Sequence, residues 1–261
     1  MKVVSEIRET KKRVVIGIDE AGRGPVVGPM VYGVFIMETA VIEDKGRRRV
    51  YRDSKEMRPE QRRRLFEELK LENGFDYAYI EVDPMHITMC MNRGVRNLNE
   101  IARDAVVALL EEVRKKCGSV ERVYVDGLGN NEKYEAFLTE KFGYDFVVEN
   151  KADSKYEVVS GASIVAKVIR DAHFEDDSRN RRMIGSHWTD LGYSELYASD
   201  KQSCGSGYPS DPDTKQWLKC NFRPISGFSR RVRHSWETVK KLLMVEKKRE
   251  LKSLPGFYLL N

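Results

Sequence analysis

The sequence predicts an α/β fold in which a mixed central sheet is flanked by helices. Three segments rich in β-branched and apolar residues occur early in the chain, at 14–18, 30–37 and 77–82. From residue 92 to residue 174, helical and strand patterns then alternate. Consecutive strands followed by alternating helices and strands are typical of a mixed sheet with helices on its faces.

Apolar periodicity places the individual elements. The run VVIGI at 14–18 ends in an acidic pair and glycines, and MVYGVFIM at 30–37 follows a turn-rich segment, so both are predicted strands. Further strands are predicted at 77–82, 122–126 and 144–148. Apolar residues at helical spacing predict helices at 58–71, 92–116, 134–142, 158–174 and 237–251.

The chain of 261 residues is long enough for one large domain and an extension. Because its character changes after Pro224, we expect a tail at 1–12, a main domain at 13–222, and a basic helical extension with an apolar tail at 223–261. The start lacks the apolar core of a signal peptide, and charged residues interrupt the most apolar region. We therefore expect a soluble intracellular protein without a membrane-spanning segment.

Composition and charge narrow the class of protein. Hydrophobic residues make up 41% of the chain and charged residues 33%, which excludes an intrinsically disordered protein. The formal net charge of +5 fits a protein that contacts a polyanion, although an ordinary charged surface explains it as well. The spacing of the four cysteines indicates neither a zinc site nor a disulfide framework.

Acidic residues stand at the ends of three predicted strands: Asp19 with Glu20, Asp126, and Asp153. Carboxylates brought together at such an edge repel one another and resist desolvation, and divalent cations resolve that conflict. Oxygen ligands without histidine or cysteine suit Mg²⁺ or Mn²⁺, and two such ions can promote phosphodiester hydrolysis. The alternative is that each acid is a solvent-facing loop residue or a helix cap.

A glycine-rich turn follows the first acidic pair. Gly22 and Gly24 flank Arg23, and glycines allow a backbone to approach a ligand closely. Backbone N–H and C=O groups can then contact a ribose 2′-hydroxyl, which both donates and accepts hydrogen bonds. The alternative is an ordinary tight turn between two strands.

These segments resemble the type 2 ribonuclease H family. The similarity runs in order from about residue 14 to residue 240. The motifs that carry it are GIDEAGRGPVVGPMVYG at 17–33, DSK at 53–55, NLN at 97–99, YVDG at 124–127, KAD at 151–153, SGASIVAKVIRD at 160–171 and GSGYPSDPDTKQWL at 205–218.

The resemblance implies a ribonuclease H-like fold and a metal-dependent endonuclease. Such an enzyme hydrolyses the RNA strand of RNA/DNA hybrids and cuts 5′ of single ribonucleotides embedded in duplex DNA, with a role in DNA replication and repair. The implied two-metal-ion mechanism leaves 3′-hydroxyl and 5′-phosphate ends. The alternatives are a non-catalytic hybrid-binding scaffold and another nuclease of the ribonuclease H fold.

The resemblance also implies roles for individual residues. The ligands of Mg²⁺ or Mn²⁺ would be Asp19, Glu20, Asp126 and Asp153. The backbone of Gly22, Arg23 and Gly24 would contact the 2′-hydroxyl at an RNA–DNA junction, and Tyr208 would stack on the sugar of the next deoxynucleotide. Candidate phosphate contacts are Lys55, Lys151, Lys167 and Arg170. We expect Asp171, which follows cationic residues on a helix, to form structural salt bridges.

The segment 228–236 (FSRRVRHSW) resembles the region after the catalytic core in eukaryotic catalytic subunits. This implies accessory subunits of a heterotrimer and a nuclear location. An archaeal-type enzyme that acts as a single chain, in the cytoplasm, is the near alternative. Arg230, Arg231 and Arg233 are expected either to contact the nucleic-acid backbone or to form a solvated basic face.

The apolar tail LPGFY at 254–258 resembles part of a sliding-clamp-binding motif. The usual glutamine of that motif is absent, because Leu251 occupies its place. Short motifs match by chance easily, so packing of the tail on its own domain or on another protein of the complex is the favoured alternative.

Overall fold

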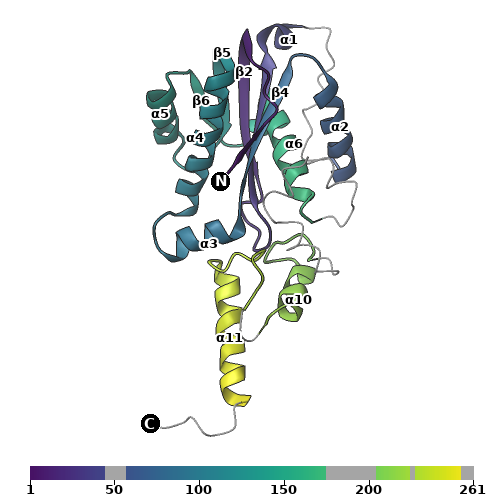
Figure 1. Cartoon of the computed structure of the whole chain (residues 1–261), viewed down its shortest axis with the longest axis vertical. Coiled ribbons are helices and arrows are strands. Elements are labelled where there is room, and N and C mark those ends of the chain that lie inside the picture. Colours follow the sequence, from purple (N-terminus) through teal and green to yellow (C-terminus); the bar gives the residue numbers. More distant parts are fainter. Residues whose placement is uncertain (45–56, 175–203, 224–226, 254–261) are drawn as a thin grey trace.

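The computed structural model of the protein describes residues 1–44, 57–174, 204–223 and 227–253. Its centre is a mixed six-stranded sheet with the strand order β1-β4-β3-β2-β5-β6 (Figure 1). The first four strands in this order pair antiparallel, whereas β5 and β6 are parallel to β2. The strands are β1 (Val3–Ser5), β2 (Thr10–Ala21), β3 (Met30–Glu38), β4 (Phe75–Val82), β5 (Cys117–Asp126) and β6 (Phe146–Glu149).

Helices cover both faces of this sheet, which confirms the predicted α/β class with a mixed sheet. The helices α3, α4 and α5 pack on one face, and α2 and α6 pack on the other (Figure 1). The helical elements are α1 (Thr39–Glu43), α2 (Pro59–Leu71), α3 (Pro84–Asn92), α4 (Leu98–Lys116), α5 (Asn131–Phe142), the 3₁₀ turn η1 (Ala152–Ser154), α6 (Glu157–Asp171), α10 (Pro212–Cys220) and α11 (Glu237–Ser253).

Several elements differ from the sequence prediction, which contains no helix at the positions of α1, α3 and α10. The single helix predicted at 92–116 is wrong, because α3 ends at Asn92 and α4 begins only at Leu98. The Asn97 side chain accepts a hydrogen bond from the N–H of Glu100, which caps α4 and fixes its start. At the N-terminus, residues 3–5 pair with β4 as an edge strand, within the segment expected to be a tail.

Helix α6 lies unusually close to the centre of the sheet. A Cβ atom placed on Gly17 of β2 would stand 2.1 Å from the carbonyl carbon of Val158, and one on Gly33 of β3 would stand 2.6 Å from the carbonyl oxygen of Ala162. Glycine is therefore the residue that lets the helix backbone rest directly on both strands. This contact fixes the start of α6, and the η1 turn just before it, against β2.

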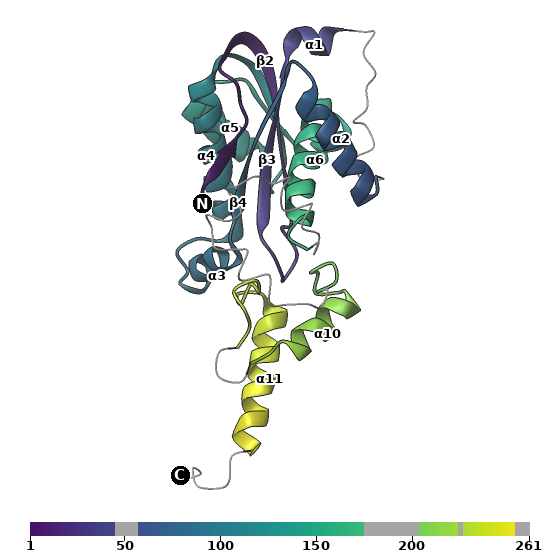
Figure 2. The same ribbon diagram turned by 45° about the vertical axis from the view of Figure 1, so that its right-hand side comes forward.

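Two apolar clusters fill the space between the sheet and the helices on its two faces. A third apolar cluster lies at the end of the sheet where β2 leads into β3. Val26 and Val27, from the connection between these strands, pack with Trp217 of α10 and with Val232 and Val239. Helices α10 and α11 project from this end of the molecule (Figure 2). No helix in the described part of the chain combines the length and apolar character needed to cross a membrane.

We predict that Gly17→Ala lowers the free energy of unfolding by about 1–3 kcal/mol or more. The added methyl group would overlap the backbone of α6, which must move to accommodate it. Denaturant unfolding would measure the loss. The matched control is Gly118→Ala in β5, where the nearest atom to an added Cβ is 3.4 Å away, so a change within about 1 kcal/mol is expected. Equal effects of the two substitutions would contradict this account of α6 packing.

Candidate active site

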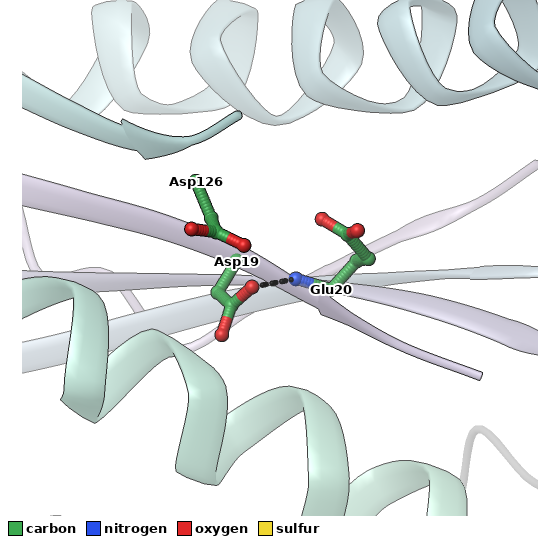
Figure 3. A group of neighbouring side chains, drawn as sticks. All are labelled: Asp19, Glu20 and Asp126. Atoms are coloured by element: carbon green, nitrogen blue, oxygen red, sulfur yellow. Dashed lines mark hydrogen bonds between the residues drawn. The ribbon is translucent and has the colours of Figure 1, made fainter. Parts of the chain in front are cut away.

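Three carboxylates converge at one edge of the central sheet. Asp19 and Glu20 lie near the end of β2, and Asp126 ends β5, the strand that pairs parallel with β2. Because parallel neighbours end at the same edge, the pairing brings these acids together. One oxygen of each of the three carboxylates lies within 4.8 Å of the others. Figure 3 shows them with the hydrogen bond that the N–H of Glu20 donates to Asp19 Oδ1, at 2.7 Å.

Asp153, the fourth predicted acid, stands next to this group without belonging to it. It lies in η1, is only 5% exposed, and is close enough to raise the pKa of both Asp19 and Glu20. The η1 turn is tied to the cluster by the N–H of Ala152, which donates to Asp126 Oδ1 at 2.8 Å. Lys151 before it has a left-handed backbone with φ of 58°, a conformation that side-chain-bearing residues adopt at some energetic cost.

In the protein without metal, nearby positive charges balance the negative charges of the carboxylates only in part. Burial, followed by repulsion from Asp126, raises the pKa of Asp19 to about 7. Burial and the neighbouring Asp19 and Asp126 raise the pKa of Glu20 to about 8, although the Arg23 guanidinium opposes this rise. Such raised pKa values mean that the site favours an added positive charge. Among the described residues, the cluster offers carboxylate oxygens and no nitrogen or sulfur ligand, which fits a hard divalent cation such as Mg²⁺ or Mn²⁺.

The glycine-rich turn and Tyr208 lie together beside the acids. Gly22 adopts a φ of 81°, a conformation that favours glycine. A Cβ placed on Gly24 would stand 3.1 Å from the ring of Tyr208, which is 40% exposed. Arg170 places its guanidinium 5.7 Å from the centre of that ring and donates to the carbonyl of Ser206 at 2.8 Å. The structure thus brings the predicted ribose-contacting turn, the aromatic residue and one predicted phosphate contact into one region.

The other predicted residues fall in different places. Lys151 is exposed at the η1 turn, and Lys167 is half-buried on α6. Lys55 lies outside the described residues, as does the tail at 254–258. Asp171 pairs with Arg62 at 2.9 Å and with Arg170 at 3.2 Å, which confirms its predicted structural salt bridges.

Arg231 and Arg233 were expected either to contact the nucleic-acid backbone or to form a solvated basic face, and the structure shows neither arrangement. Arg231 is 7% exposed and Arg233 is fully buried, so neither forms a solvated basic face nor contacts nucleic acid from the surface. The one sequence signal for this arrangement is the apolar spacing of Phe228, Val232 and Trp236 around them, which pack in the third cluster. Arg230, by contrast, is exposed, so the alternatives suggested by the sequence stay open for that residue alone. Arg233 is buried among the carbonyls of Gly22, Arg23 and Gly28, to which its guanidinium donates.

We predict that, without metal, the protein loses stability as pH rises from about 4 to about 8. Asp19 and Glu20 have raised pKa values, so in this window the folded state binds more protons than the unfolded state, and the free energy of unfolding falls. Melting temperatures in EDTA at pH 5.5 and 8.5 would measure this. Mn²⁺ should raise the melting temperature more at pH 8.5, where protons no longer compete for the carboxylates.

The control for this prediction is Asp126→Asn, which removes one repulsive charge from the cluster. Its melting temperature in EDTA should exceed that of the unchanged protein at pH 8.5 by several °C, at roughly 2–4 °C per kcal/mol. It should also respond less to Mn²⁺. A variant that melts below the unchanged protein at this pH would show that repulsion among the acids is unimportant.

The family model and the curated relatives that match this chain all point to the same family. The model of the family described as Ribonuclease HII matches residues 16–239. A ribonuclease H2 subunit of Arabidopsis thaliana is 37% identical over 225 residues, which cover 85% of this chain and 71% of that protein. Ribonuclease HII of Pyrococcus horikoshii is also 37% identical, over 235 residues that cover 87% of this chain and 92% of that protein.

Solved structures agree with this similarity. The crystal structure of ribonuclease H2 from Pyrococcus horikoshii OT3 matches with a TM-score of 0.68 and 33% identity, covering 90% of this chain and 99% of that one. The RNase HII chain of a PCNA complex from Archaeoglobus fulgidus matches with a TM-score of 0.64 and 29% identity, over 86% and 95% of the two chains. With the acidic cluster at the sheet edge, these matches show that the chain belongs to the ribonuclease HII family and is a ribonuclease H-type hydrolase.

Proposed function

We propose that the protein hydrolyses the RNA strand of RNA/DNA hybrids and cuts 5′ of single ribonucleotides embedded in duplex DNA, leaving 3′-hydroxyl and 5′-phosphate ends. The observation that carries this proposal is the position of the acidic cluster beside the turn 22–24 and Tyr208. A phosphodiester held at the acids would place the neighbouring ribose within reach of the turn. Hydrolysis and ribose selection would then act on the same junction.

In this proposal Asp19, Glu20, Asp126 and Asp153 hold two divalent cations, Mg²⁺ or Mn²⁺. Bound there, the cations would stabilise negative charge on the scissile phosphate and lower the pKa of water. The chain itself orients the carboxylates: the N–H of Glu20 donates to Asp19, and the N–H of Ala152 donates to Asp126. Arg23 stands beside Glu20 and is hydrogen-bonded to Asn99, so it adds positive charge next to the acids without occupying the cluster.

Ribose selection would rest on two contacts. The backbone of Gly22, Arg23 and Gly24 would bind the 2′-hydroxyl of the ribonucleotide. The exposed ring of Tyr208, which faces Gly24, would stack on the next sugar, where an additional hydroxyl would be unfavourable. Lys151, Lys167 and Arg170 would contact phosphates, and Lys55 stays a prediction of the sequence.

The proposed partners rest on the names of the relatives. Several relatives are each named as one subunit of ribonuclease H2, which supports accessory subunits for this chain, in the nucleus if the source is a eukaryote. The archaeal relative is equally similar, so a chain that acts alone in the cytoplasm is the alternative within the same family. A sliding clamp is a further proposed partner, because the solved Archaeoglobus fulgidus RNase HII is in complex with PCNA.

We predict that the purified chain cuts a DNA duplex with one embedded ribonucleotide in Mg²⁺, on the 5′ side of that ribonucleotide. Asp126→Asn should lower the rate by more than about 100-fold, because several kcal/mol of transition-state stabilisation depends on the metal ligands. Gel analysis of end-labelled duplexes measures both. Asp145→Asn is the matched control, since this exposed acid pairs with Arg122 away from the cluster.

If the chain does not cut alone, the same assay is repeated with candidate accessory subunits. Persistent inactivity together with tight binding of the hybrid would support the non-catalytic scaffold instead. A chain that cuts long hybrids but not a single embedded ribonucleotide would contradict the type 2 activity and favour another nuclease of the same fold.

We predict that Tyr208→Ala lowers cleavage at a single ribonucleotide by about 10–100-fold, because loss of base- or sugar-stacking surface costs about 1–3 kcal/mol. Tyr208→Phe keeps the ring that faces Gly24 and should keep most of the activity. Single-turnover rates on matched substrates would measure this. Equal losses in both variants would assign the role to the hydroxyl rather than to the ring.

A further inference from the structure

The carbonyl side of the turn 22–24 is held by residues that lie more than 200 positions later in the sequence. Arg233 donates from Nη2 to the carbonyl of Gly22 at 2.5 Å and from Nη1 to the carbonyl of Arg23 at 3.0 Å. Trp236 donates from its indole Nε1 to the carbonyl of Gly24 at 3.1 Å. Each of the three residues of the turn therefore has its carbonyl oxygen bound by the C-terminal segment (residues 227–239).

The guanidinium of Arg233 is fixed as well as buried. Its Nε donates to the carbonyl of Gly28 at 3.0 Å, and its planar face lies 4.9 Å from the centre of the Trp236 ring. Its own backbone N–H donates to the carbonyl of Val26 at 2.8 Å. A buried charge is costly unless hydrogen bonds surround it, and the rigid fork of arginine satisfies several carbonyls at once.

The backbone N–H groups of the turn differ from its carbonyls in having no partner among the described residues. The N–H groups of Gly22, Arg23 and Gly24 make no hydrogen bond to any other residue in the part of the chain that the structure describes. The carbonyls accept hydrogen bonds from the C-terminal segment, whereas the N–H groups stay available as donors, with Gly24 the exposed member of the turn. A ribose 2′-hydroxyl accepts such hydrogen bonds, whereas the hydrogen of a deoxyribose does not.

We propose that Arg233 is a positioning residue for ribose selection: it holds the carbonyls of the turn so that the backbone N–H groups face the 2′-hydroxyl. The proposal rests on the proposed function of the turn 22–24. Trp236 supports the same position through Gly24. Lysine cannot replace Arg233 here, because a single ammonium does not reach three carbonyls with the geometry of a planar fork.

The test compares Arg233→Lys with Arg231→Lys. Arg231 is also buried in the C-terminal segment, but its side chain donates to the carbonyl of His173 and contacts Cys204, not the turn. Equilibrium binding is measured in Ca²⁺ for two duplexes of one sequence, one with a single ribonucleotide and one all-DNA. The readout is the ratio of the two affinities, and melting temperatures are recorded in parallel.

We expect Arg233→Lys to lower the ribonucleotide-to-DNA affinity ratio at least about tenfold, with little change in binding of the all-DNA duplex. Arg231→Lys should keep the ratio even if it lowers the melting temperature to a similar extent. Trp236→Phe, which removes the indole donor to Gly24 and makes the ring beside Arg233 smaller, should lower the ratio by a smaller factor. This second variant tests the proposal even if Arg233→Lys fails to fold.

Three results would overturn one or the other of these claims. If the unchanged protein binds both duplexes equally, the proposed role of the turn in ribose selection is wrong. If the unchanged protein prefers the ribonucleotide and both Arg233→Lys and Trp236→Phe keep that preference, the turn selects ribose without this support, and the positioning role of Arg233 is wrong. A fall in the ratio that Arg231→Lys reproduces would likewise overturn it, because general loosening of the C-terminal segment would explain the effect.

Discussion

The parallel pairing of β2 with β5 is the constraint on which the candidate site depends. It ends two apolar strands at one edge, where the buried Asp19 meets the half-buried Asp126. Burial of the charged Asp19 beside Asp126 is unfavourable in the free protein, and burial is the main cause of the raised pKa of Asp19. Burial of apolar residues on both faces of the sheet stabilises the fold and offsets this unfavourable free energy. A rigid framework thus holds together charges that would separate in a flexible loop.

The site also joins segments that are distant in sequence. The turn 22–24 leaves β2, Tyr208 precedes α10, and Arg233 precedes α11. Their common support is the third apolar cluster, in which Val26 and Val27 pack with residues from both sides of position 223. The expected boundary between a main domain and an extension stays a prediction. In the structure, the residues on either side of that position share one core.

Local patterns in the sequence predicted the sheet class, the central strands and the acids, because β-branched runs and strand-end carboxylates are local signals. The sequence prediction of one helix at 92–116 misses the break between α3 and α4, although Asn97 and Glu100 form a recognisable capping box. The edge strand at 3–5 has three residues, too few for a period to appear. Arg231 and Arg233 were predicted wrongly for another reason: the partners of Arg233 are backbone carbonyls of the β2–β3 connection, and no local pattern encodes such a distant contact.

The late position of Arg233 and Trp236 has a consequence for biosynthesis. Every residue of the acidic cluster, and every strand of the sheet, is synthesised before residue 154, whereas the groups that bind the carbonyls of the turn come about 80 residues later. A nascent chain released or cleaved between these points would contain the acidic cluster but not the side chains that bind the carbonyls of the turn 22–24. Only the completed C-terminal segment supplies the hydrogen bonds that Arg233 and Trp236 donate to the turn 22–24.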